Sequence, residues 1–293
     1  MENSKFYSRR QMIKSTAALA GLAPLAPWWE VFGAAKKKPY RIGACDWSLG
    51  KGSAVEALAV ARQIGLDGVQ VSLGTAANDM HLRRPDIQQA YRDAAKKYGV
   101  QVAGLAIGEL NRVPYKSAPE TEAWVSDSID VAQAMNCKVI LLAFFDKGDL
   151  KGDKAGQQEV IARLRKVAPK AERAGVILGI ESWLSAREHL DLIEAVGSKN
   201  VRVYYDVANA QKMGYDIYAE MAQLGSAYIC EVHAKENDSL LGQGKVDFTR
   251  VRHLLDDMGY AGWVQIEGAR SKNADLLTDY KANRQFLQTV LNT

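Results

Sequence analysis

Four residues that can bind a metal ion follow one another at similar intervals in the second half of the chain: Glu181, Asp206, His233 and Glu267. They close short apolar runs, in the segments GIES, YYDVAN, EVHAKE and QIEG, and are separated by 25, 27 and 34 residues. Three carboxylates and one imidazole suit a single divalent ion such as Mn²⁺, Mg²⁺, Co²⁺ or Zn²⁺. Converging acids without a cation would repel one another, so convergence of the four predicts a metal site.

Each of these residues also has an ordinary structural explanation. A carboxylate after a strand often caps the next helix, and a lone histidine is often a hydrogen-bonded structural group. What favours a metal site is the recurrence of ligand types at equivalent positions of successive segments. The interpretation therefore depends on elements that bring these positions together.

Short apolar segments alternate with longer amphipathic segments eight times after residue 35. The short segments are rich in β-branched and aromatic residues and are too short for helices, which predicts strands. These expected strands cover 40–48, 68–74, 100–108, 138–145, 176–183, 201–209, 228–235 and 262–268.

The segments between them place apolar residues three or four apart, and several end near a glycine, as helices do. The expected helices cover 54–65, 86–99, 121–136, 158–175, 186–197, 216–225, 248–260 and 274–291. Eight β-α units in about 255 residues predict a single-domain α/β protein, a (β/α)8 TIM barrel over residues 36–293. The four ligands would then meet at the C-terminal ends of adjacent strands. An open doubly wound sheet is the alternative, but no G-x-G-x-x-G follows the first strand.

The motifs GIES, YYDVANA, EVHAKE and QIEG resemble those of the xylose-isomerase-like TIM-barrel superfamily, often described as sugar phosphate isomerases/epimerases. The resemblance implies that Glu181, Asp206, His233 and Glu267 bind one divalent metal ion. It also implies that Glu181 and Glu267 exchange protons with a substrate carbon. Lys235 matches an H-x-K pattern and is expected to bind substrate oxygens or to act as an acid; a solvated loop lysine is the alternative.

Such a site removes a proton next to a carbonyl, and the metal stabilises the resulting enediolate. Reprotonation gives an epimer or an isomer, and loss of a β-substituent gives elimination. In ketose epimerases of this superfamily a histidine usually follows the aspartate by three residues, where this chain has Asn209. They also carry an arginine beyond the metal-binding histidine, where this chain has Asn237, Asp238 and Ser239. Both departures argue against ketose 3-epimerisation. The missing arginine, together with the export predicted below, favours an unphosphorylated sugar, with a lyase or hydratase of 3-keto-glycosides as the alternative.

Further residues are expected at the same mouth of the barrel. The predicted substrate-binding residues are Asn209, Trp183, Glu109, Arg270 and Asp46. Trp47, Asn111 and Gln243 are weaker candidates of the same kind. His81, His189 and His253 fall in a loop or in helices and are expected at the surface. The three cysteines, Cys45, Cys137 and Cys230, lie in or beside apolar runs and are expected to be buried.

The N-terminal residues 1–35 resemble a twin-arginine export signal. Arg9 and Arg10 are followed by an apolar stretch of moderate hydrophobicity, which Pro24 and Pro27 interrupt. This pattern predicts an exported, periplasmic enzyme without a membrane anchor after signal removal. An amphipathic N-terminal helix or a membrane anchor is the alternative.

The charge balance argues against nucleic acid as a partner. The formal net charge is +4, of which the first 35 residues contribute two. The zinc endonucleases of the same superfamily need many histidines, and this chain has four. The expected partner is a small carbohydrate, and assembly into a homo-oligomer is compatible with the pattern. A non-catalytic periplasmic sugar-binding barrel that keeps the metal site is a second alternative function.

Overall fold

Eight parallel strands form a closed barrel in the order β1 to β8, as the sequence predicts. The computed structural model describes residues 40–272 and 275–292, so the predicted signal segment, 1–35, lies outside the described residues. The strands are β1 (Arg41–Cys45), β2 (Gly68–Ser72), β3 (Gln101–Ile107), β4 (Val139–Phe144), β5 (Ile177–Ser182), β6 (Val201–Asp206), β7 (Ile229–Ala234) and β8 (Trp263–Ile266).

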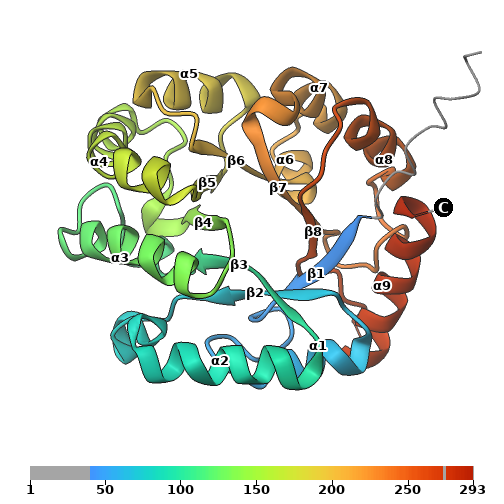
Figure 1. The fold of residues 1–293 in the computed structure, drawn as a ribbon. Coiled ribbons are helices and arrows are strands. Elements are labelled where there is room, and N and C mark those ends of the chain that lie inside the picture. Colours follow the sequence, from blue (N-terminus) through green and yellow to red (C-terminus); the bar gives the residue numbers. More distant parts are fainter. Residues whose placement is uncertain (1–39, 273–274, 293) are drawn as a thin grey trace, which may run out of the picture. The chain divides into compact units, whose positions relative to one another are not determined.

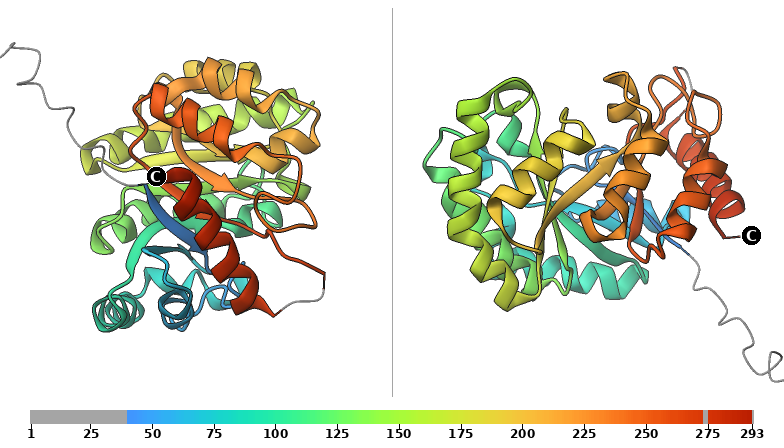
Figure 2. Two further views of the ribbon diagram at one scale, coloured as in Figure 1. Left: turned by 90° about the vertical axis from the view of Figure 1, so that its right-hand side faces the viewer. Right: turned by 90° about the horizontal axis from the view of Figure 1, so that it is seen from above.

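The helices surround this barrel (Figure 1). They are α1 (Ala57–Ile64), α2 (Pro85–Tyr98), α3 (Glu120–Ala134), α4 (Lys154–Ala174), α5 (Ala186–Val196), α6 (Val207–Lys212), α7 (Ile217–Tyr228), α8 (Phe248–Asp257) and α9 (Leu276–Leu291). Short 3-10 helices follow β2, β3 and β4: η2 (Ala76–Asn78), η3 (His81–Arg83), η4 (Gly108–Asn111) and η5 (Asp146–Gly148). Figure 2 shows α9 beside β1, where the end of the chain meets the first strand of the ring.

Local signals fix the helix ends. Helices α1, α2, α4 and α5 end at glycines in the left-handed conformation, with φ between 63° and 89°. At such φ values glycine lacks the steric penalty of other residues. Helix α5 begins with a capping box, in which Ser185 and Glu188 satisfy each other's backbone N–H groups. These ends set the lengths of the loops that carry the site.

Two expectations from the sequence are wrong. The strand expected over 201–209 ends at Asp206, because the side chain of Asp206 caps a short helix, α6, that the apolar pattern VAN does not reveal. His189 is not a surface residue: it is 3% exposed, with Ser182 Oγ 3.0 Å from its Nε2. Burial lowers the pKa of His189 to about 4, so this ring is neutral at physiological pH.

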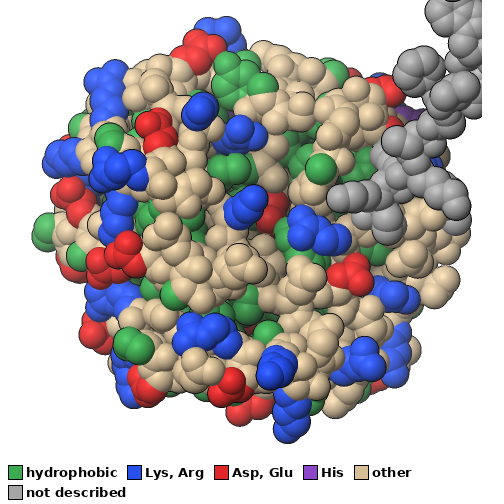
Figure 3. Space-filling view, in the orientation of Figure 1, with side chains coloured by type: hydrophobic (Ala, Val, Ile, Leu, Met, Phe, Trp, Pro, Cys, Tyr) green, Lys and Arg blue, Asp and Glu red, His purple; other side chains and the backbone are tan. Residues whose placement is uncertain are grey.

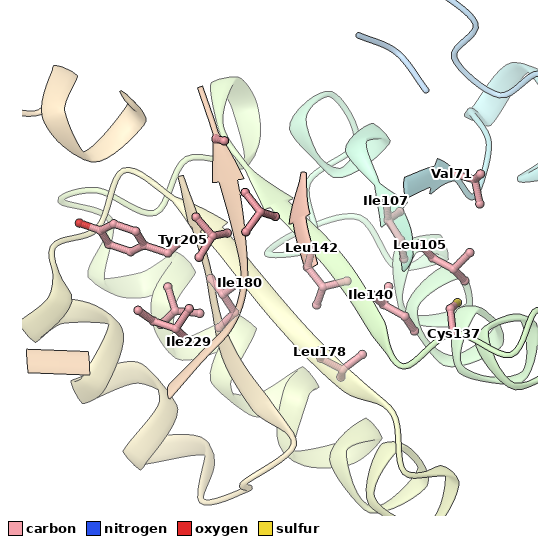
Figure 4. Close-up of a cluster of buried hydrophobic side chains, with 14 of the residues drawn as sticks. Val71, Leu105, Ile107, Cys137, Ile140, Leu142, Leu178, Ile180, Tyr205 and Ile229 are labelled. Atoms are coloured by element: carbon pink, nitrogen blue, oxygen red, sulfur yellow. The ribbon is translucent and has the colours of Figure 1, made fainter. Parts of the chain in front are cut away.

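The main hydrophobic core lies between the strands and the surrounding helices. Figure 4 shows part of it, with Leu142, Ile180 and Ile229 among the labelled side chains of three strands. A smaller apolar cluster, which includes Ala106, Leu141 and Tyr204, is separate from this core. All three cysteines are buried. Two apolar layers therefore hold the strands, and the C-terminal strand ends remain available for polar side chains.

The surface carries charges of both signs. Figure 3 shows Lys and Arg side chains interspersed with Asp and Glu on the face drawn there. Within the described residues, no helix has the length and apolar character needed to cross a bilayer.

Candidate metal centre at the mouth of the barrel

The four predicted ligands converge at the C-terminal ends of β5 to β8. Glu181, Asp206, His233 and Glu267 each offer one ligand atom, and these atoms lie within 4.8 Å of one another. His233 Nδ1 is 3.0 Å from Glu181 Oε1, 3.5 Å from Glu267 Oε2 and 3.8 Å from Asp206 Oδ2. Because neighbouring parallel strands end at one face of the barrel, the regular sequence spacing has become one cluster.

The other nitrogen of His233 is held by a glutamine on the opposite side of the barrel. Nε2 lies 3.0 Å from Gln70 Oε1 and 3.4 Å from Cys45 Sγ. A carbonyl oxygen accepts a hydrogen bond, so Nε2 carries a proton, and Nδ1 is the ring nitrogen that faces the cluster. A metal ligand whose other ring nitrogen is fixed in this way is the usual arrangement in metalloproteins.

Asp206 caps a helix and joins the ligand cluster at the same time. Its Oδ1 accepts hydrogen bonds of 2.8 Å from the backbone N–H groups of Ala208 and Asn209. Its Oδ2 is buried without a hydrogen bond and faces the cluster. A buried carboxylate oxygen without a hydrogen bond is costly unless it meets a cation; Lys235 Nζ lies 3.4 Å away, and a divalent ion would meet the same requirement more closely.

The electrostatics of the cluster also fit a cation. Burial raises the pKa of Asp206 to about 7, and the negative charges of Glu267 and Glu181 add to this effect. For His233, burial opposes the charged form, but Cys45, Glu181 and Glu267 raise its pKa well above the ordinary value. Positive charge is therefore favoured where the imidazole and the three carboxylates meet.

Lys235 lies at the edge of the same cluster. Its Nζ donates to Glu267 Oε2 at 2.8 Å and to Asn209 Oδ1 at 3.3 Å, and it lies 3.4 Å from Asp206 Oδ2. Burial opposes its charge, but Asp206 and Glu267 raise the pKa of Lys235 above its usual range. Burial likewise opposes ionisation of Glu267, yet His233 and Lys235 lower the pKa of Glu267 to about 2. Lys235 is thus a charged group of the site rather than a solvated loop residue.

A cavity of about 550 Å³ opens above the cluster. Glu181, Glu267, Lys235 and Asn209 line one part of it. Its other walls come from the first four β-α units and from the loop after β5: Trp47, Gly52, Ser53, Ser72, Gly74, Thr75, Gly108, Glu109, Asn111, Arg112, Leu141, Ala143, Phe145, Asp146 and Trp183. This volume lies within the range of about 300–1,000 Å³ typical of small-molecule sites.

Three of the predicted substrate-binding residues line this cavity: Asn209, Trp183 and Glu109. Asn209 Nδ2 lies 3.4 Å from Glu181 Oε1, so the amide connects Glu181 to Lys235. The ring of Trp183 packs edge-on against Phe145, with centroids 4.8 Å apart. Glu109 is buried and pairs with Arg112 at 2.6 Å.

Asp46 and Arg270 are not brought to the cavity. Asp46 is fully buried and accepts hydrogen bonds from Ser53 N, Ser72 N and Ser72 Oγ, so it joins the loop after β1 to the end of β2. The Nε of Arg270 donates to Asp279 of α9. Their positions after β1 and β8 suggested substrate contact, but the carboxylate of Asp46 is bound to Ser53 and Ser72, and Arg270 is turned toward α9. Gln243 is also outside the lining.

The contributors that the sequence reasoning missed include Gln70 and Phe145. Gln70, which holds His233, is the one polar residue among the first four of GVQVS, and that isolated polarity was its available signal. Phe145 directly follows the apolar strand β4 and had no signal that distinguished it from the core.

The family model for xylose isomerase-like TIM barrels matches residues 58–290. The chain belongs to this family. It is similar to 2-epi-5-epi-valiolone 7-phosphate 2-epimerase of an Actinoplanes species, at 25% identity over 70% of this chain and 78% of the relative. It is also similar to L-ribulose-5-phosphate 3-epimerase UlaE of Escherichia coli, at 26% identity over 73% of this chain and 81% of the relative. These homologues are sugar epimerases, and this chain is an enzyme of the same superfamily.

Solved structures show the same fold at lower identity. D-psicose 3-epimerase matches 86% of this chain and all of its own, with a TM-score of 0.73 and 17% identity. The 3-keto-D-glucoside 4-epimerase YcjR of Escherichia coli matches 85% of this chain and 99% of its own, with a TM-score of 0.68 and 15% identity.

Proposed function

We propose that this protein is a divalent-metal-dependent sugar isomerase or epimerase that removes a proton next to a carbonyl of an unphosphorylated sugar. The observation that carries the proposal is the convergence of Glu181, Asp206, His233 and Glu267 at the base of a cavity large enough for a sugar. A bound divalent ion would polarise the carbonyl and stabilise the negative charge of the enediolate.

The side chains around the cluster have distinct tasks in this proposal. Glu181 and Glu267 both line the cavity and exchange protons with the substrate carbon. Lys235, held by Glu267 and Asn209, donates a hydrogen bond to a substrate oxygen. Asn209 keeps Lys235 and Glu181 in fixed relative positions, which limits the motion of groups that must act together.

The basic side chains of the cavity are already paired with carboxylates, which supports an unphosphorylated substrate. Among the described lining residues, the Lys and Arg side chains are Lys235 and Arg112, and each contacts a carboxylate: Glu267 at 2.8 Å and Glu109 at 2.6 Å. A phosphate would have to displace one of these partners before it could be bound. The two curated relatives named above act on phosphorylated sugars, so phosphorylated substrates belong in the test. The predicted export signal favours an unphosphorylated sugar independently.

A lyase or hydratase of 3-keto-glycosides is the second candidate, and the shape of the cavity favours it. Trp183 and Phe145 form an aromatic wall beside the polar groups, and Leu141 and Ala143 continue this apolar side. Aromatic and apolar surface of this extent suits a second ring or an aglycone. The same proton transfer next to a carbonyl would then be followed by loss of the β-substituent.

Metal analysis of the purified protein, followed by NMR in D₂O with a panel of sugars, tests the proposal. The panel contains free ketoses, 3-keto-glycosides and phosphorylated ketoses. We expect bound divalent metal and deuterium incorporation next to the carbonyl of an unphosphorylated sugar. Exchange confined to the phosphorylated sugars would refute the substrate class. Sugar binding by the metal-loaded protein without any exchange would leave a sugar-binding barrel instead of an enzyme.

A further inference from the structure

The two carboxylate oxygens of Glu267 are held by donors from two different parts of the barrel. Oε2 accepts from Lys235 Nζ at 2.8 Å and faces His233 Nδ1 at 3.5 Å. Oε1 accepts from the indole Nε1 of Trp47 at 2.9 Å. One oxygen is therefore turned toward the ligand cluster and the other away from it.

Trp47 is held in a turn whose backbone is fixed on both sides. The residue before it, Asp46, is buried and accepts three hydrogen bonds from Ser53 and Ser72. The residue after it, Ser48, accepts a hydrogen bond of 3.1 Å from Gly268 N, next to Glu267. The indole also lies edge-on to the ring of His233, with centroids 6.3 Å apart. The turn after β1 thus carries the donor to Glu267 on a rigid support.

The backbone on the Glu267 side is also fixed. Gly268 and Ala269 adopt left-handed conformations with φ of 60° and 52°. Helix α9 holds both carbonyls: Tyr280 Oη donates to Gly268 O at 2.9 Å, and Asn283 Nδ2 donates to Ala269 O at 2.6 Å. With the backbone held, the remaining freedom of Glu267 is rotation of its side chain and carboxylate.

We propose that Trp47 is a positioning residue that holds Glu267 with Oε2 toward the ligand cluster and Oε1 toward the substrate. This inference rests on the proposed function, because it assigns proton transfer to Oε1. The indole N–H uses one lone pair of Oε1, and the second lone pair remains available for a proton. Without this donor the carboxylate can turn both oxygens toward the cluster, and the proton acceptor moves away from the substrate carbon.

The variant Trp47→Phe tests this inference, because it removes the N–H donor and keeps an aromatic ring in the cavity wall. We expect kcat to fall by about 10–100-fold, since small displacements of a reacting group are costly. KM should change by less than about twofold, because the ring surface remains. Trp124→Phe is the matched control: Trp124 is buried on α3 in the outer layer, and its variant should keep the parent kcat.

A second measurement reports on Glu267 without any substrate. The visible absorption of protein loaded with Co²⁺ depends on the number and arrangement of its ligands. We expect a changed spectrum for Trp47→Phe and the parent spectrum for Trp124→Phe. Trp47→His, which keeps a ring N–H, should regain part of the lost kcat and serves as the second variant if Trp47→Phe does not fold.

The outcomes separate this inference from the proposed function. A parent protein that binds Co²⁺ but exchanges no sugar proton refutes the proposed function and the assignment of Oε1, while the Co²⁺ spectra still decide whether Trp47 positions Glu267. A Trp47→Phe protein with the parent kcat and spectrum overturns the inference. A raised KM with unchanged kcat also overturns it, because Trp47 would then be only a contact surface for the substrate.

Discussion

Two layers of polar side chains occupy the same strands of this barrel, two residues apart along the chain. The upper layer contains Asp206, His233 and Glu267 together with Glu181 of β5. The lower layer contains Tyr204, Glu231 and Gln265, at the preceding alternate positions of β6, β7 and β8, and all three are buried. The strands, the burial and the residue types are similar, but the surroundings of the carboxylates differ.

In the lower layer the carboxyl group of Glu231 has a hydrogen-bond donor and does not line the cavity. Tyr204 Oη donates to Glu231 Oε2 at 2.9 Å, and burial raises the pKa of Glu231 to about 8. Glu231 is therefore protonated over most of the physiological range. In the upper layer three carboxylates surround one imidazole nitrogen, and two of them, Glu181 and Glu267, line the cavity, so the upper layer has the donor set to hold a metal ion. The comparison shows what distinguishes a carboxylate of the candidate site from a carboxyl group of the packed interior. The difference lies in its hydrogen-bond donors and its access to the cavity, and not in its acidity alone.

The largest expected effect is a difference in catalytic rate between a variant of the upper layer and a variant of the lower layer. Glu267→Gln should lower the rate of deuterium exchange into the substrate by about 10³-fold, because a positioned acid or base contributes about 10²–10⁴-fold. Glu231→Gln replaces a protonated carboxyl with an amide of similar shape and should keep the rate within about threefold. NMR in D₂O measures both rates. Equal losses in the two variants would contradict the division into layers.

Stabilisation of the protein by a metal ion should depend on the upper layer and not on the lower layer. A chelator should lower the melting temperature of the parent, and Mn²⁺ at about 100 times its Kd should restore about 2.7 kcal/mol of stability. Asp206→Asn, which keeps a good helix cap for α6, should lose this response because it lacks one carboxylate ligand. Glu231→Gln should retain the response in the same thermal scans. If Asp206→Asn were still stabilised by Mn²⁺ to the parent extent, Asp206 would not be a ligand.

The lower layer should make stability depend on pH. The folded pKa of Glu231, about 8, lies above its ordinary value of 4.5. Its contribution to the free energy of unfolding is fully present below about pH 4.5 and is lost as pH rises to about 8. Relative to Glu231→Gln, the parent should lose roughly 3–4 kcal/mol between pH 5 and 8, about three quarters of what the full shift corresponds to. Urea unfolding at several pH values checks this difference, and parallel curves for the two proteins would refute the raised pKa.

The smallest expected effect concerns the donor to Glu231. Tyr204→Phe removes the hydroxyl and keeps the ring that packs against His233, with centroids 4.5 Å apart. The buried carboxyl then lacks this donor, and we expect a loss of about 1–2 kcal/mol in the free energy of unfolding. Exchange activity should remain near the parent value. A large loss of exchange without a loss of stability would place the lower layer in the reaction.

The sequence by itself determined the barrel and the convergence of Glu181, Asp206, His233 and Glu267 at its mouth. Strand and helix periods repeat eight times, and ligand types recur at the ends of four consecutive strands, so a parallel barrel must bring them together. Lys235 followed from the H-x-K pattern that begins at His233. These features depend on local sequence patterns and on the rule that the strands of a parallel barrel all end at one face. They can therefore be predicted from the sequence.

Only the tertiary structure decided which neighbouring polar residues belong to the site. Asp46 and Trp47 are adjacent in the chain, yet Asp46 joins the loop after β1 to the end of β2 and Trp47 contacts Glu267, because successive side chains of the turn point in different directions. Gln70 reaches His233 across the barrel, a contact between residues 163 positions apart. Helix α6 forms because Asp206 caps it after the strand ends. Such contacts depend on side-chain direction and on packing across the barrel, which a periodic pattern does not encode.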